Sequence, residues 1–95
     1  IHLRTEYEFS KYNFELANIE MLKRFFVESK GECENLLKNN LSLPAYDYCL
    51  KCSHLFNLLD ARGSISVTER ARYILEIREL AKKSAELYLE TYENK

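Results

Sequence analysis

The chain has 95 residues, the size of one domain with a single core. It is 46% hydrophobic and 31% charged, with two glycines and one proline, so it is too apolar for disorder and too poor in turn formers for a many-stranded sheet. A net charge of -1 gives the whole chain no electrostatic reason to bind nucleic acid or anionic lipid. We therefore expect an all-α fold of about four helices, in which any RNA contact is local.

The first two helices are expected in residues 3–16 and from residue 19 onward. The first is short, with an exit near residues 12–13, and Asn18 can cap the second by accepting from a free backbone N–H. The second helix has an apolar stripe at helical spacing, formed by Ile19, Leu22, Phe26, Cys33 and Leu37. Gly31 weakens this helix by about 1 kcal/mol relative to alanine.

A third helix is expected to begin at Pro44, after the turn-forming residues 39–43. Its predicted buried stripe consists of Ala45, Cys49, Cys52, Phe56 and Leu59. Gly63 can adopt the left-handed conformation that closes a helix.

The last helix is predicted over residues 67–92, roughly 39 Å at 1.5 Å per residue. Ser66 and Glu69 have the spacing of a capping box at its start. Its predicted apolar face is broad and contains Ile74, Ile77, Leu80, Ala81, Ala85, Leu87 and Tyr88.

Cys49, Cys52 and His54 form the one arrangement that suggests a metal. A structural zinc site needs four ligands, and the other candidates, Cys33 and His2, have no paired spacing. A thioredoxin-like redox pair would need a βαβ unit. We expect instead that the thiols pack in the core, and we assign no metal ligand.

Other side chains allow more than one role. His54 could shuttle a proton with Asp60 or Asn57 as partner, but a structural hydrogen-bonding role is favoured. The seven tyrosines could include platforms for stacking RNA bases, but most are expected to pack.

Four arginines surround the start of the last helix: Arg62, Arg70, Arg72 and Arg78. Arginine suits phosphate, yet Asp60, Glu69, Glu76 and Glu79 lie among the four, so ion pairs are the favoured interpretation. A glycine-rich phosphate loop, a serine elbow and a carboxylate cluster for magnesium are all missing from the sequence. We therefore predict no catalytic or cofactor-binding residue in this chain.

A long run at residues 53–70 resembles the C-terminal region of the alpha subunit of bacterial heterotetrameric glycyl-tRNA synthetase. The run reads SHLFNLLDARGSISVTER. Further matches in the same order are YNFE at 12–15, LPAYDY at 43–48, RYIL at 72–75 and IR at 77–78. The resemblance covers essentially the whole chain.

The resemblance implies a cytoplasmic enzyme of two alpha and two beta subunits that uses ATP and Mg²⁺ to attach glycine to tRNA(Gly). The three signature motifs of its class II catalytic core do not occur here. Residues 1–95 are therefore expected to form a single C-terminal helical domain, a fragment that is inactive alone and binds no cofactor. Three cysteines without a secretory signal also favour the reducing cytoplasm, and no membrane partner is expected.

Two roles remain open for the domain itself. In the first, it is an assembly module whose long last helix contacts the beta subunit or the second alpha subunit. In the second, Arg62, Arg70 or Arg72 touches the acceptor end of tRNA. The mixed charge favours the first, because phosphate binding would leave an uncompensated basic face.

Overall fold

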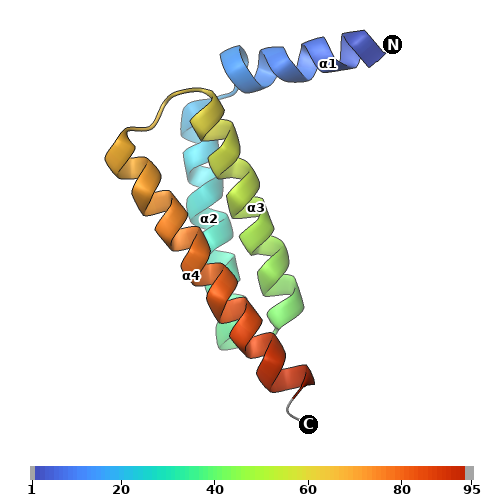
Figure 1. The fold of residues 1–95 in the computed structure, drawn as a ribbon, viewed down its shortest axis with the longest axis vertical. Helices are drawn as coiled ribbons and strands as arrows, with labels where there is room; N and C mark the ends of the chain where they lie inside the picture. The colour runs from blue at the N-terminus through green and yellow to red at the C-terminus, as the bar shows by residue number, and fades with distance from the viewer. Residues whose placement is uncertain (1, 94–95) are drawn as a thin grey trace.

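The computed structural model describes residues 2–93, and these form helices and short connections. The elements are α1 (His2–Lys11), the π-helical turn η1 (Tyr12–Leu16), α2 (Ile19–Lys38), α3 (Ser42–Ala61) and α4 (Val67–Tyr92). The described part of the chain contains no strand. The predicted all-α fold with a long last helix is confirmed (Figure 1).

Asparagines cap both ends of helix α2, Asn18 before its first residue and Asn39 after its last. The Met21 N–H donates to the Asn18 side-chain oxygen at 3.0 Å, which confirms the predicted cap. Beyond its last turn Asn40 adopts a φ of 60°, and the Leu41 N–H returns to the Leu36 carbonyl at 3.0 Å. Asparagine tolerates this left-handed conformation better than most residues, so the turn into α3 is tight. Gly31 does not interrupt the helix.

Helix α3 begins at Ser42, so the predicted start at Pro44 is wrong by two residues. The first four N–H groups of a helix have no intrahelical acceptor, so a proline at the third position costs no hydrogen bond. The predicted stripe is confirmed, because Ala45, Cys49, Cys52, Phe56 and Leu59 are all buried. The predicted stop is confirmed too, since Gly63 has a φ of 65°.

Helix α4 begins at the predicted capping box. The Glu69 N–H donates to the Ser66 hydroxyl at 3.1 Å, and the Ser66 N–H donates to the Glu69 carboxylate at 3.2 Å. The second of these bonds lowers the pKa of the Glu69 carboxyl. Of the predicted apolar face, Leu80 is buried, but Ala85 and Tyr88 are exposed, so that expectation is wrong there. These two positions border an open groove beside α3.

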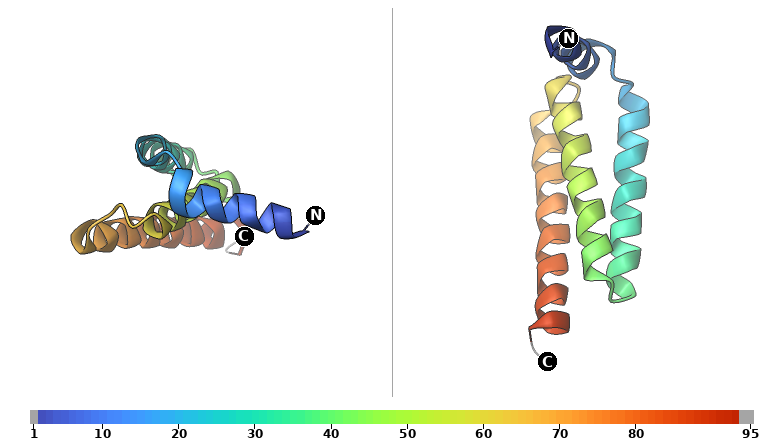
Figure 2. Two further views of the ribbon diagram at one scale, coloured as in Figure 1. Left: turned by 90° about the horizontal axis from the view of Figure 1, so that it is seen from above. Right: turned by 90° about the vertical axis from the view of Figure 1, so that its right-hand side faces the viewer.

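Three helices form the bundle, and α3 packs against both α2 and α4 (Figure 2). Its centre is aromatic. The ring of Phe26 meets the edge of Tyr73 at a centroid distance of 4.6 Å, and Phe56 lies 5.9 Å from Tyr73. One residue from each helix therefore joins this cluster, and Tyr73 was not among the predicted buried residues.

Helix α1 and η1 form an arm that projects from one end of the bundle (Figures 1 and 2). The α-helical part of the first segment ends at Lys11, next to the predicted exit, but the chain does not leave the helix there. The helix widens into the π turn, in which the Ala17 N–H donates to the Tyr12 carbonyl at 2.8 Å. Within residues 2–93, α1 contacts no element except η1, and η1 touches α3.

Candidate interaction surfaces

The three thiols belong to the core. Each donates to a backbone carbonyl: Cys33 to Ala45 at 3.1 Å, Cys49 to Ile77 at 3.8 Å and Cys52 to Phe26 at 3.9 Å. Burial raises the pKa of all three thiols, that of Cys52 to about 12. Metal binding and nucleophilic attack require the thiolate, so these groups are held in the unreactive form at neutral pH.

The structure does not bring the candidate zinc ligands together. Among the described residues, no group of three or more histidines, cysteines or acidic residues is placed to hold a metal. The side chain of His2 lies outside the described set. The core packing expected for Cys49 and Cys52 is confirmed.

His54 and Asn57 lie on the outer side of α3. Both side chains are exposed, and within residues 2–93 neither forms a hydrogen bond, so the structural bonding expected of His54 is not seen. The physical reason is register, because position 54 points away from the stripe that contains Cys49 and Cys52. His54 lies instead in a groove between α2 and α3.

The arginines do not converge on one point. The Arg70 Nε lies 3.3 Å from a carboxylate oxygen of Asp60, so this arginine joins the start of α4 to the end of α3. The Arg72 guanidinium lies 3.8 Å from Glu76 and stacks 5.0 Å from the ring of Tyr73. Two of the four arginines thus form the ion pairs that mixed charge predicted.

Glu76 and the remaining two arginines complete this region. The Glu76 carboxylate also forms an ion pair with Lys30 of α2 at 3.4 Å, so it already has two cationic partners. Arg78 is exposed and has no ion pair within the described residues. Arg62 is half-buried, and its buried Nη1 has no hydrogen-bond partner in the described part of the chain. Most buried polar groups in proteins have a partner, so this nitrogen is an exception within the described residues.

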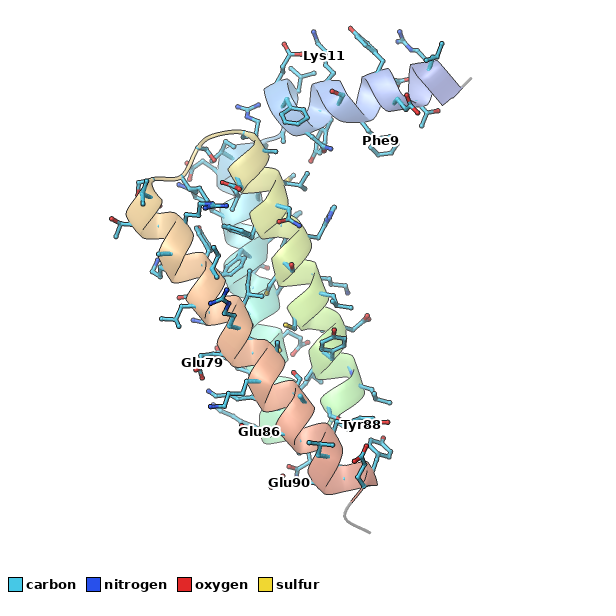
Figure 3. All side chains as sticks on the ribbon, viewed as in Figure 1. Phe9, Lys11, Glu79, Glu86, Tyr88 and Glu90 are labelled. Carbon is cyan, nitrogen blue, oxygen red and sulfur yellow. The ribbon has the colours of Figure 1, made fainter. Side chains whose placement is uncertain are left out.

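The arm carries a set of uncovered apolar side chains. Leu3 is 82% exposed, Phe9 65%, Phe14 60% and Leu16 66%. Figure 3 shows Phe9 projecting from α1. Side chains of this size are usually found covered. The arm is therefore an apolar feature that the bundle itself leaves open, whereas the sequence pattern predicted only a short helix there.

A second uncovered region is the α3–α4 groove, a hollow of about 440 Å³. It is lined by Ser42, Leu43, Tyr46, Ser84, Ala85, Tyr88 and Leu89. The Ser84 hydroxyl donates to the Leu80 carbonyl at 2.8 Å, so the wall of the groove has no unsatisfied hydroxyl there. Tyr88, labelled in Figure 3, stacks with Tyr92 at 4.9 Å. Ala85 and Tyr88, which the sequence placed on the buried face of α4, line this open groove instead of being covered by α3.

These features define a class: a small all-α domain with a packed thiol core, capped helices and apolar surfaces that it does not cover itself. No helix in residues 2–93 combines the length and the apolar character needed to cross a bilayer.

The family model for the glycyl-tRNA synthetase alpha subunit matches residues 1–93. The chain belongs to this family, and it corresponds to the C-terminal region of the alpha subunit.

Proposed function

We propose that this domain is an assembly module of a glycine–tRNA ligase, which binds the beta subunit or a second alpha subunit. The arm is the observation that carries the proposal. In this assignment the class II catalytic core, with its ATP, Mg²⁺ and glycine sites, lies in another part of the alpha subunit, and the chain of 95 residues has no ligase activity alone.

The energetics of the arm support a covering partner. Helix α1 has 10 residues, and isolated helices shorter than about 12–15 residues are marginal in water. Surface ion pairs such as Arg4 with Glu8 at 3.1 Å add only a few tenths of a kcal/mol. Burying a leucine or phenylalanine side chain contributes about 1.5–3 kcal/mol, so a partner surface over Phe9 would stabilise the helix far more than these ion pairs do.

A direct tRNA contact is the second candidate, and one observation favours it. The Nη1 of Arg62 has no partner among the described residues but is buried, so it could donate to a phosphate oxygen of the acceptor end only once the side chain turns outward. Against it, Arg70 and Arg72 already face Asp60 and Glu76, so two of the three arginines considered for this contact have carboxylate partners. Assembly is therefore the function that the geometry supports better.

The test compares two changes of equal charge on the arm of the full alpha subunit. Phe9→Glu places a carboxylate on the apolar surface, whereas Ser10→Glu places one at the neighbouring exposed polar position. We expect Phe9→Glu to weaken subunit association at least tenfold, measured by analytical ultracentrifugation, and Ser10→Glu to leave it unchanged. Circular dichroism checks that both variants keep their helix content.

A different set of results would favour tRNA contact over assembly. If the unmodified chain binds tRNA tightly with a steep salt dependence, Arg62→Ala abolishes that binding, and Phe9→Glu leaves subunit association intact, then tRNA contact is the function and assembly is not.

A further inference from the structure

The outer edge of the α2–α3 pair carries a groove that the assembly proposal does not use. It is a hollow of about 660 Å³. Its lining residues come from α2 and α3 alone and include Phe25, Glu28, Glu32, Asp47, Leu50 and His54. Neither the arm nor α4 contributes to it, so it is separate from the surfaces described above.

The floor of this groove is apolar and incompletely covered. Phe25 of α2 is 44% exposed and Leu50 of α3 is 50% exposed, while Leu55, which also lines the groove, is buried. A groove between two packed helices has the shape that receives a further helix, as in four-helix bundles. The occupant therefore needs an apolar stripe.

The rim of the groove is acidic, and its carboxylates form no ion pair with the residues that the structure describes. Glu28 and Glu32 stand four residues apart on α2, and Asp47 faces the hollow from α3. Within residues 2–93 none of the three forms an ion pair, although Glu32 accepts a hydrogen bond from Asn35 at 3.3 Å.

One lysine, Lys51, lines the groove, and its ammonium group contacts an aromatic ring. The Lys51 ammonium is 4.1 Å from the centroid of Tyr48, a cation–π distance. It does not neutralise the acidic rim through an ion pair. By contrast, Asp60 and Glu76 elsewhere in the bundle do have cationic partners.

From this combination we propose that the α2–α3 groove binds a basic amphipathic helix of a partner protein, with the helix's apolar stripe on Phe25 and Leu50 and its lysines or arginines against Glu28, Glu32 and Asp47. Opposite charge across the rim fixes the register of such a helix and speeds encounter. The groove proposal does not depend on the arm, so the groove proposal and the assembly proposal can be refuted independently.

A second copy of this chain is the less suitable occupant. Its unpaired cations on α4 include Arg78 and Lys82, and α4 takes no part in the groove. A copy docked through α4 would join two different faces, a head-to-tail contact that tends to propagate instead of closing a dimer.

The first experiment is a nuclear magnetic resonance titration of the ¹⁵N-labelled chain. The probes are a synthetic helical peptide with a leucine stripe flanked by lysines, and a counterpart with glutamate at every lysine. We expect saturable binding of the lysine peptide, shifts centred on the amides of Glu28, Asp47 and Leu50, and weaker binding at higher salt. The glutamate peptide should not bind.

Charge reversal supplies the matched control. Glu28→Lys with Glu32→Lys should weaken binding of the lysine peptide at least tenfold and allow the glutamate peptide to bind. The same double change at Glu86 and Glu90, which are also four residues apart but lie on α4 (Figure 3), should alter neither affinity. Equal binding of the two peptides, shifts centred on the α3–α4 groove, or failure of both peptides to saturate would each overturn the proposal.

The second experiment identifies the natural occupant in the assembled synthetase. A photo-reactive phenylalanine analogue at position 50 of the full alpha subunit should crosslink to a helical segment rich in lysine or arginine on another protein. Crosslinks to an acidic segment, to RNA, or to a second alpha subunit through its own α4 would overturn it. A loss of assembly in Phe9→Glu with this crosslink absent would leave the arm proposal standing and remove only the groove proposal.

Discussion

Replacing Phe26 with alanine should remove the side chain on which the three-helix packing depends. Phe26 is 1% exposed and meets Tyr73 of α4 edge-on at 4.6 Å. Tyr73 in turn lies 5.9 Å from Phe56 of α3. Truncation at Phe26 therefore opens a cavity where all three helices meet.

The magnitude follows from the lost burial and the lost ring contact. Changing a buried phenylalanine to alanine costs about 3–5 kcal/mol. The lost edge-on ring contact accounts for roughly 0.5–1.5 kcal/mol of this cost. A domain of this size has a total stability of about 5–14 kcal/mol. The variant should consequently lose about a fifth or more of its stability, and its Tm should fall by at least about 12 °C.

The neighbouring phenylalanine is the control. Phe25 has the same chemistry one position away but is 44% exposed, so Phe25→Ala should cost only roughly 1 kcal/mol. Both variants are measured by urea denaturation followed by circular dichroism, with thermal melts alongside. Equal losses for the two would refute the assignment of Phe26 to the centre of the core.

The remaining predictions concern caps, glycines and a thiol, all measured by urea denaturation. Gly31→Ala should stabilise by about 1 kcal/mol, because nothing lies within 4 Å of the added Cβ; a loss of stability would contradict this. Gly63→Ala should destabilise by about 1–2 kcal/mol, because φ is 65°, and a gain of stability would contradict that. Ser66→Ala should cost about 1 kcal/mol through the lost cap, and no loss would mean that the capping box is dispensable. Burial raises the pKa of Cys52 from 9.0 to about 12, so the unfolded chain releases this proton first, and stability should be full below about pH 9 and fall between pH 9 and 12. Cys52→Ala should show a shallower decline over that window, and an identical decline would contradict the raised pKa.

Much of the fold could be predicted from local chemistry. The caps at Asn18, Ser66 and Gly63 depend on a few adjacent residues, and each is where the sequence places it. The start of α3 was missed because a proline fits any position of a first helical turn, so Pro44 alone does not fix the boundary. Tyr73 was missed because its burial depends on Phe26 and on where α2 crosses α4.

The candidate surfaces were harder to predict, since exposure is a property of the assembled bundle. The apolar pattern of Ala85 and Tyr88 is real, yet the first residues of α3 leave an open groove beside them. Similarly, residues 3–16 contain apolar side chains at helical spacing, but nothing in the pattern states that α1 leaves the bundle. The acidic groove combines Glu28 and Glu32 with Asp47 of another helix, and only the packing of α2 on α3 brings the three together.

Which charged side chains are paired and which are unpaired distinguishes an RNA partner from a protein partner better than the net charge of -1 does. Where an RNA-binding surface would need free cations, at Arg70 and Arg72, the guanidinium groups already face carboxylates. Where carboxylates stand unpaired, at Glu28, Glu32 and Asp47, they border an apolar floor. Phosphate would be repelled from that groove, whereas a basic helix gains both ion pairs and apolar burial there. The apolar arm and the acidic groove are therefore suited to protein partners, whereas Arg78 on α4, which has no ion pair within residues 2–93, is a group that suits an anion.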